Sequence, residues 1–423
     1  MRGQRLANRL SDLKTVLFGA LVAQLTPIVA SVVIARLVLV SDYGTFSIWL
    51  GLALILSVVI TGRFEAALAI IPDGVLRSRA VTIVISTATF AGLVCLISIP
   101  GLSFAIKASG WIESSGYSAI AFVELTGVTI LTGIVLSFSQ TLQSWAAADG
   151  RYRDLSAIRV TNSVTTSVAQ IVAGIIYPSA LLLLVAHMVG AALATLLSYR
   201  FLNGDNRLTK IRWTDILTFW RQFSAFPKFA LPADLISAIT AQVPLLFLGS
   251  RFGPESAGYL ALTQKVLGAP ISLLGKAFLD LFKRDAAQAY IREGRCSTEY
   301  LFTLKILAMT SAVFSTVVLL FADQIFNVAY GPSWSVSGEF AILLLPLFAM
   351  RFMASPLSYV VYIVGKQYLD LIWQLLLALV VGLSFMAFSD VYLTISAYSW
   401  AYTTMYAGYL YMTYKLSLGT VQR

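Results

Sequence analysis

The sequence predicts an all-α integral membrane protein with about 12 transmembrane helices. Hydrophobic residues make up 58% of the 423 positions, charged residues make up 12%, and the mean hydropathy is +0.82. A soluble domain carries about 25% charged residues, so half of the charge that would cover a water-exposed surface is missing. Apolar stretches recur along the chain and reach the roughly 20 residues that a helix needs to cross a bilayer.

These apolar stretches fall into two groups of six, separated by a polar, basic segment at 201–222. The first stretch, 15–40, follows four basic residues, but it is much longer than the roughly 7–15 apolar residues of a signal peptide. It is therefore interpreted as a retained span. The predicted spans are 15–40, 44–62, 80–100, 118–138, 155–177, 179–199, 223–249, 257–282, 306–322, 337–364, 368–388 and 391–414. The predicted domains are an N-terminal six-helix bundle (1–200), a basic cytoplasmic segment (201–222) and a C-terminal six-helix bundle (223–423).

Lysine and arginine lie almost entirely on one side of these spans. Of the 30 basic residues, 23 fall on the side of the amino terminus, and only Lys107 and Arg251 fall on the other. Because cytoplasmic loops are enriched in Lys and Arg, both termini are predicted to be cytoplasmic in a multi-pass inner-membrane protein. The net charge of +10 then reflects topology residues beside an anionic leaflet, and it requires no nucleic-acid partner.

The two groups of spans begin with a similar short motif. Residues 42–46 read Asp-Tyr-Gly-Thr-Phe, and residues 255–259 read Glu-Ser-Ala-Gly-Tyr. Both motifs have the order acidic residue, any residue, small residue, any residue, aromatic residue, and both lead into a predicted helix. With six spans in each half, the halves insert in the same orientation. The pattern therefore predicts a parallel repeat, as in several transporter folds.

Nine ionisable residues lie inside the predicted spans or at their edges. Arg351 is near the middle of its span, and Lys265 lies roughly 12 Å of helix into its own. A central Arg or Lys costs about 2.5–3.5 kcal/mol on insertion, so both are predicted to face a cavity. The nine residues are Arg36, Arg159, Lys265, Lys276, Arg351, Glu65, Glu124, Asp234 and Asp280.

Several of these charges have alternative explanations. Arg63 and Glu65, at a cytoplasmic helix end, can pair with each other. Asp234 follows Pro227 and Pro232, and it can neutralise a buried cation or carry a coupling ion; neutralisation is favoured. Residues close to span ends can extend to the interface: Arg36, Glu124, Lys276 and Asp280.

A cavity with more cations than anions suits an anionic substrate. If that substrate had a lipid tail, the tail could stay in the bilayer while the charged head crossed the protein. The sequence predicts no catalytic residues, no metal site and no cofactor. It has one histidine, two cysteines in different settings, and no Gly-rich phosphate loop with a Walker lysine, so the energy source is an ion gradient, a substrate gradient or downstream removal.

The last span carries tyrosines on one helix face. They recur at i, i+4, i+8 and i+11, and such rings can stack on sugars or can serve as interfacial belts and helix packing. The second interpretation is favoured. The residues are Tyr398, Tyr402, Tyr406 and Tyr409.

Four stretches of the chain are similar to those of a known family, in the same order. The first comprises Ala35–Leu37, Ser41–Phe46 and RFEAALAI at 63–70, and the second is RYRDLSAIRV at 151–160. The third, the most specific, runs from FPKFALPADL at 226–235 to RFGPESAGYLALTQKVLGAPISLLGKAF at 251–278, and the fourth is RFMASPLSYVVYIVGKQ at 351–367. With these motifs the chain resembles bacterial oligosaccharide flippases of the O-antigen and capsule type. These form the polysaccharide transporter family of the multidrug/oligosaccharidyl-lipid/polysaccharide exporter superfamily.

The resemblance implies two six-helix bundles flanking a central cavity and an alternating-access cycle. The implied substrate is an oligosaccharide on undecaprenyl pyrophosphate, moved from the cytoplasmic to the periplasmic leaflet for surface polysaccharide biosynthesis. A polysaccharide polymerase and a chain-length regulator are the implied protein partners. Relatives often have Arg where this chain has Lys265, which keeps the charge but loses a two-pronged phosphate contact. The cationic cavity of the family corresponds here to Arg36, Arg63, Arg159, Lys265 and Arg351.

Two other functions are alternatives. A drug or cation antiporter of the same superfamily would favour an excess of intramembrane carboxylates, whereas this chain has more intramembrane cations. A membrane polysaccharide polymerase or acyltransferase would need a catalytic constellation, commonly with a large periplasmic loop. The longest predicted periplasmic connections, 101–117 and 323–336, are short.

Overall fold

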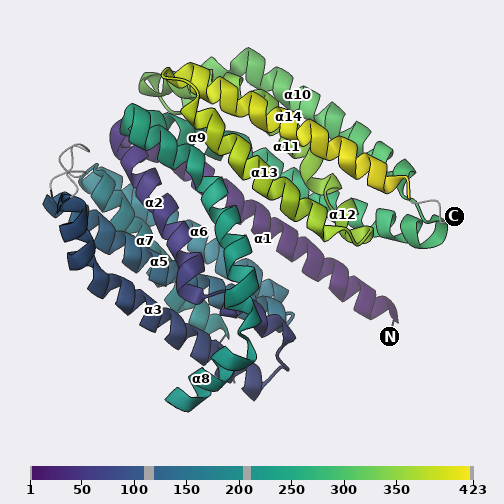
Figure 1. Cartoon of the computed structure of the whole chain (residues 1–423), viewed down its shortest axis with the longest axis horizontal. Helices are drawn as coiled ribbons and strands as arrows, with labels where there is room; N and C mark the ends of the chain where they lie inside the picture. Colours follow the sequence, from purple (N-terminus) through teal and green to yellow (C-terminus); the bar gives the residue numbers. More distant parts are fainter. Residues whose placement is uncertain (1, 109–118, 203–210, 420–423) are drawn as a thin grey trace. The chain divides into compact units, whose positions relative to one another are not determined.

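The computed structural model describes residues 2–108, 119–202 and 211–419, which are predominantly helical (Figure 1). Contacts between the helices divide the chain into two compact units, Met1–Ala257 and Gly258–Arg423. We refer to them as unit 1 and unit 2.

Unit 1 contains six long helices, several short ones and the first part of a seventh long helix. Its long helices are α1 (Arg2–Leu37), α2 (Val40–Thr61), α3 (Val75–Ala108), α5 (Ala119–Ala148), α6 (Tyr152–Ile176) and α7 (Ala180–Leu202). Its short elements are η1 (Phe64–Ile70), α8 (Trp213–Gln222) and the wide-turned helix η2 (Phe226–Ala230).

The boundary between the units lies within α9 (Leu231–Glu293), which is interrupted at Gly253, where φ is 86° and ψ is 167°. This left-handed backbone breaks the helical hydrogen bonding and makes α9 two helical segments. Unit 2 continues with α10 (Ser297–Ala329), η3 (Pro332–Trp334), α11 (Ser335–Leu357), α12 (Val360–Ile363), α13 (Gln367–Met386) and α14 (Val391–Ser417).

Corresponding helices have corresponding neighbours inside each unit. In unit 1, α5 packs against α3 and α7, and α7 packs against α6. In unit 2, α11 packs against α10 and α14, and α14 packs against α13 (Figure 1). Both copies of the short acidic motif open a helical segment that follows a break, after Leu37 in one case and after Gly253 in the other. These features agree with the predicted repeat.

The predicted membrane fold is confirmed. Nine helical stretches among the described residues are long and apolar enough to cross a membrane. One of them contains both segments of α9, while α6 and α14 are too polar to be counted. The two segments of α9 count separately, and α6 and α14 are added to the apolar helices. The described residues then contain twelve long helical segments, which correspond to the twelve predicted spans.

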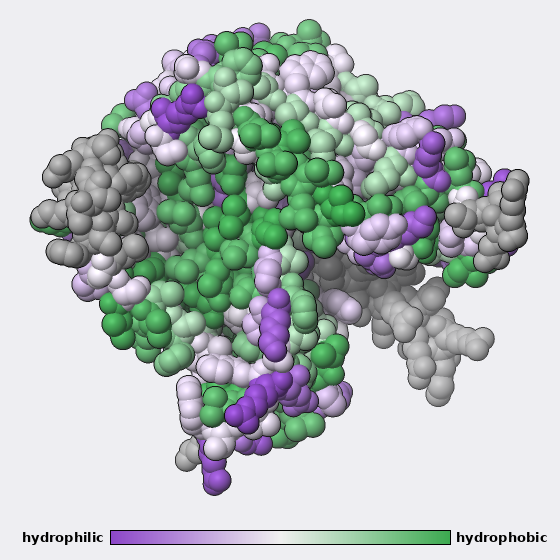
Figure 2. All heavy atoms as spheres, in the orientation of Figure 1, coloured by the Kyte–Doolittle hydropathy of each residue, from purple (hydrophilic) through white to green (hydrophobic). Residues whose placement is uncertain are grey.

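Large hydrophobic side chains are exposed along most of these helices. Green, hydrophobic atoms cover much of the face shown in Figure 2, and examples lie on α3 (Ile97, 78% exposed), α10 (Val328, 72%) and α13 (Leu379, 59%). In water such a surface would drive aggregation. It is the surface expected of helices that contact lipid chains.

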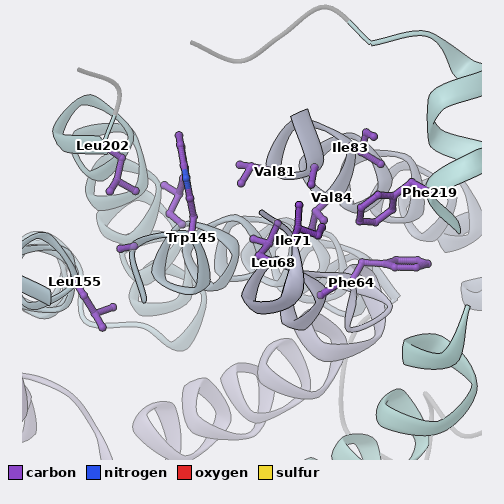
Figure 3. Packing of buried hydrophobic residues seen from close by; sticks show 14 of the residues in the cluster. Phe64, Leu68, Ile71, Val81, Ile83, Val84, Trp145, Leu155, Leu202 and Phe219 are labelled. Atoms are coloured by element: carbon purple, nitrogen blue, oxygen red, sulfur yellow. The ribbon is translucent and has the colours of Figure 1, made fainter. Parts of the chain in front are cut away.

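Unit 1 contains a tightly packed hydrophobic core around η1. Phe64, Leu68 and Ile71 from the η1 region pack with α3, α5, α6, α7 and α8 (Figure 3). Trp145 on α5 is 1% exposed within this core. We call this set the η1 core; its buried members are Phe64, Ala67, Leu68, Ile71, Ala80, Val81, Ile83, Val84, Leu142, Trp145, Ala146, Leu155, Ile158, Leu202, Ile216 and Phe219.

The polar helix α6 uses much of its polarity for packing. Ser163 Oγ donates to the carbonyl of Ala23 on α1 at 2.7 Å, and Thr165 Oγ1 donates to the carbonyl of Gly190 on α7 at 2.8 Å. A Cβ at Gly190 would lie 2.6 Å from the Cα of Thr166. Small residues allow membrane helices to approach this closely and to share side-chain hydrogen bonds.

Three features differ from the sequence-based expectations in detail. The basic segment at 201–222 contains helix α8, which was not predicted, and its residues 203–210 lie outside the described part. The predicted span 337–364 is divided into α11 and α12. Residues 223–257 belong to unit 1 by their contacts, so the assignment of a C-terminal bundle to 223–423 stays a prediction.

Candidate functional site

Arg63 lies in unit 1 where the chain leaves α2. Gly62 and Arg63 are both left-handed, with φ of 57° and 60°, a conformation that is unfavourable for a residue with a Cβ. The turn places the Arg63 guanidinium between two carboxylates. Its Nη1 is 2.8 Å from Glu65 Oε1, and its Nε is 2.6 Å from Asp234 Oδ2.

The two carboxylates are held by different parts of unit 1. Glu65 is 2% exposed in η1, beside Phe64, which belongs to the η1 core. Asp234 lies in the first turn of α9, directly after η2 and Pro232. Wide-turned helical segments of this kind often occur at functional sites. The group carries one positive and two negative charges, so the charge of Arg63 is more than compensated by the protein itself.

Arg159 is a different kind of cation in the same unit. It is half-buried in α6, and its Nε donates to Gln143 Oε1 on α5 at 3.4 Å. Within the described residues, no carboxylate lies within ion-pair distance of its guanidinium. Its hydrogen-bond partner is a neutral amide, so no described side chain compensates its positive charge.

Arg351 is the corresponding uncompensated cation in unit 2. It lies in α11, between Pro346 and Pro356, and its side chain is exposed. Its guanidinium interacts electrostatically with tyrosines of α14, which are Tyr398, Tyr402 and Tyr406. No ion pair with a carboxylate is found for Arg351 in the part of the chain that the structure describes. Tyrosine side chains are neutral at ordinary pH, so this neighbourhood does not cancel the charge of the guanidinium.

The tyrosines of α14 pack between helices. Tyr398 and Tyr402 are 6% and 9% exposed, their ring centroids are 5.6 Å apart, and Tyr406 follows 5.1 Å from Tyr402. Trp373 of α13 lies 5.0 Å from Tyr406 and 4.4 Å from Tyr409. The ring faces are therefore used for packing, as the favoured interpretation of the sequence expected, and they are not open platforms for sugars.

The remaining two predicted cavity residues have other surroundings. Lys265 is half-buried in the unit 2 part of α9, and Arg36 is exposed in the last turn of α1. Both are engaged by neighbouring residues. The structure thus brings together Arg63, Glu65 and Asp234 in unit 1.

Several polar residues of the spans were missed by the sequence analysis. Gln143 contacts Arg159, and Gln140 Nε2 donates to Ser57 Oγ on α2 at 3.1 Å. In unit 2, Asp370 Oδ1 accepts from the Tyr409 hydroxyl at 2.7 Å, and its Oδ2 accepts from Gln374 Nε2 at 2.9 Å. Amides inside apolar segments were a visible signal, since polar groups in membrane helices are costly unless they are used.

The described residues hold no group of three or more His, Cys, Asp or Glu side chains that could bind a metal ion. The polar side chains named above carry charges, amides and hydroxyls. Such groups bind and orient ions and polar molecules.

Comparison with solved structures identifies the class of fold. The chain is similar to a lipid II flippase MurJ in an inward closed conformation, with 13% identity and a TM-score of 0.73 over 95% of this chain and 89% of that one. It is also similar to the MATE multidrug transporter DinF-BH, with 14% identity, a TM-score of 0.65, and coverage of 95% and 93%. An inward-facing multidrug resistance MATE family transporter of the MOP superfamily gives 15% identity and a TM-score of 0.60, with the same coverage. The fold is that of transporters of this superfamily.

The family follows from the sequence itself. The profile of the family described as polysaccharide biosynthesis protein matches residues 33–339, which is more than half of the chain. The protein belongs to this family of polysaccharide biosynthesis proteins, as the motif resemblance predicted. No curated protein sequence matches the chain at a significant level.

Proposed function

We propose that this protein flips an oligosaccharide carried on undecaprenyl pyrophosphate from the cytoplasmic to the periplasmic leaflet of a bacterial inner membrane. It acts by alternating access, with both termini in the cytoplasm, in the biosynthesis of O-antigen, capsule or exopolysaccharide. The lipid tail stays among the membrane lipids while the charged head crosses through the protein. A polysaccharide polymerase and a chain-length regulator are the expected downstream partners.

The observation that supports this most strongly is Arg351. An arginine within a membrane helix, near tyrosines of α14 and without a carboxylate partner among the described residues, is expensive to keep unless an anion uses it. A pyrophosphate is such an anion, and a guanidinium contacts it through two parallel hydrogen bonds. A drug or cation antiporter would gain nothing from this arrangement, because an uncompensated cation repels its substrate.

The other candidate residues are assigned roles by their partners. Arg159 and Lys265 supply further positive charge for the anionic head, and Arg36 does so near a helix end. Arg63 is tied to Glu65 and Asp234, so we assign this group to charge pairing that holds α9, with Asp234 or Glu65 as the candidate for ion coupling. The membership in a polysaccharide biosynthesis family and the likeness to the structure of a lipid II flippase favour a lipid-linked sugar as substrate.

The test is to delete the gene in its host and determine the leaflet in which undecaprenyl-linked repeat units accumulate. We expect accumulation in the cytoplasmic leaflet and loss of surface polysaccharide, both rescued by the wild-type protein. Arg351→Ala, present at wild-type abundance, should fail to rescue, and Arg351→Lys should rescue in part. A normal leaflet distribution with short or unpolymerised surface chains would instead assign the protein to polymerisation.

A further inference from the structure

Helix α8 lies outside the predicted spans and packs against α3 (Figure 1). Its buried side chains, Ile216 and Phe219, belong to the η1 core. The ring of Phe219 lies 5.7 Å from that of Phe64 between centroids, and the two are neighbours in Figure 3. Trp220 Nε1 donates to Thr87 Oγ1 on α3 at 2.9 Å. These contacts fix how α8 is rotated about its axis, so its other sides are defined surfaces.

One exposed side of α8 is apolar. Trp213, Leu217 and Trp220 follow the spacing i, i+4, i+7 and therefore share one stripe of the helix. Trp220 faces α3, whereas Trp213 is 54% exposed and Leu217 is also exposed. The exposed apolar side thus directly adjoins the side that packs on unit 1.

This apolar side continues the exposed hydrophobic surface of α3. The ring of Trp213 contacts Phe90 of α3 edge to face, with centroids 6.0 Å apart, and Phe90 is itself 50% exposed. Phe90 belongs to the stretch Val75–Gly101, which is long and apolar enough to cross a membrane. A tryptophan that is exposed beside such a stretch is typical of the boundary between lipid and water.

The next side of α8 is polar and basic. Arg221 follows Leu217 at i+4 and Arg212 precedes the first turn, and both are exposed. No ion pair with a carboxylate is found for either guanidinium in the described parts of the chain. Asp215, the one acidic residue of α8, is bonded instead to Arg79 of α3 at 2.6 Å. The exposed surface of α8 therefore presents positive charge next to apolar side chains.

We propose that this exposed surface of α8 binds acidic phospholipids at the boundary of the membrane. Trp213 and Leu217 lie among lipid chains beside α3. Arg212 and Arg221 contact the phosphates of the headgroups through charge-assisted hydrogen bonds. A helix that combines an apolar side with an adjoining basic side is suited to an anionic lipid surface. The inference concerns the surrounding lipid and does not depend on which substrate the protein transports.

The experiment determines which lipids surround Trp213 in the purified full-length protein, reconstituted in phosphatidylcholine nanodiscs. A small fraction of the lipid carries an acyl-chain spin label, which quenches nearby tryptophan emission, on either phosphatidylglycerol or phosphatidylcholine. The Trp213 contribution is the difference between the emission of the wild type and of Trp213→Phe. The Trp220 contribution, obtained in the same way with Trp220→Phe, is the control on the same helix, because Trp220 is half-buried.

We expect both labelled lipids to quench Trp213 more than Trp220. Labelled phosphatidylglycerol should quench Trp213 about fivefold more effectively than labelled phosphatidylcholine, as for the attraction of a basic residue to an anionic surface. The double variant Arg212→Gln/Arg221→Gln should lose this preference, and Arg212→Lys/Arg221→Lys should keep it, which separates the charge from the packing. Arg292→Gln is the matched control, an exposed arginine in the last turn of α9 in unit 2, and it should match the wild type. High salt should weaken the preference.

Three results would overturn the inference. Absence of quenching of Trp213 by either lipid would place the exposed side of α8 in water. Equal quenching by the two labelled lipids would leave an apolar contact with no preference for acidic lipid. A preference that persists in the double Gln variant, or that is lost in the double Lys variant, would show that the charge of these arginines is not its cause. None of these results bears on the flippase assignment, which the leaflet assay tests.

Discussion

Arg63 in unit 1 and Arg351 in unit 2 were predicted to serve one purpose, but their surroundings are opposite. Arg63 is held by two carboxylates at 2.8 and 2.6 Å, whereas Arg351 lies within electrostatic range of three tyrosines of α14 and has no carboxylate partner in the described part of the chain. The first group carries a net charge of one negative unit, and the second keeps a full positive charge. Two arginines of one membrane protein can thus have different functions, and the neighbouring groups decide which function each one has.

The difference has an energetic consequence. Fixed carboxylates stabilise a buried guanidinium, and the group becomes costly to disrupt because any remaining charge loses its partner. A guanidinium in a membrane helix without a carboxylate partner keeps its cost of insertion, so an incoming anion can recover part of that cost. The paired arginine is expected to stabilise the fold, and the unpaired one is expected to bind.

The largest effect is expected from Arg63→Ala. This substitution leaves Glu65, which is 2% exposed, without a counter-charge, and we expect the free energy of unfolding to fall by about 3 kcal/mol. Thermal unfolding of the purified protein measures this loss. The double variant Arg63→Ala/Glu65→Gln should recover most of it, and a single variant as stable as the wild type would contradict the structural role.

Arg351→Gln is expected to lower flipping activity without lowering stability. Flipping should fall about tenfold or more, as for the loss of a charge-assisted hydrogen bond. The unfolding temperature should stay the same or rise, because a central arginine itself costs about 2.5–3.5 kcal/mol in a membrane helix. A destabilisation as large as that of Arg63→Ala would show that the two arginines are equivalent after all.

A smaller effect separates two tyrosines on one face of α14. The Tyr409 hydroxyl donates to Asp370 at 2.7 Å, so Tyr409→Phe should lower the free energy of unfolding by about 1–2 kcal/mol. Tyr402→Phe keeps the ring packing and should leave stability nearly unchanged while weakening transport. Parallel unfolding and flipping assays on both variants test this; an equal loss of stability would contradict different roles for the two hydroxyls.

The smallest effect concerns an ion pair outside the spans, between Asp215 of α8 and Arg79 of α3, 2.6 Å apart. The backbone N–H of Arg212 and the Arg79 side chain lower the pKa of the Asp215 carboxyl. Because the pKa is lower in the folded state, the contact stabilises α8 at pH values above the ordinary aspartate pKa of about 3.9. This stabilisation is lost as the pH falls through the lower pKa of the folded state.

The emission of Trp220, whose Nε1 donates to Thr87 of α3 at 2.9 Å, measures the docking of α8. The Trp220 contribution is the difference between the emission spectra of the wild type and of Trp220→Phe. We expect a constant signal from pH 7 down to about pH 4 and a change below that range. Asp215→Asn should lack the acid transition, and the same transition in that variant would assign it to another group.

Individual residues show how much of the candidate site could be predicted from the sequence. The pairing of Arg63 with Glu65 could be anticipated because the two are close in the chain, and Asp234 was expected to neutralise some cation. Gln143 was overlooked because the predicted span ended at 138, whereas α5 continues to Ala148, and because the sequence does not show which residue of another helix an amide meets. Helix α8 was overlooked because it is short and only one of its sides is apolar. That side carries Ile216 and Phe219, which are buried in the η1 core.

The sequence by itself determined the membrane class, the helical segments and the family, because hydropathy, charge asymmetry and motif order are properties that add up along the chain. The tertiary structure decided which cations are compensated. Arg63 meets Asp234 and Arg351 meets the tyrosines of α14 through contacts between distant segments. Charge compensation depends on distances of a few ångströms between helices, and hydropathy does not specify those distances.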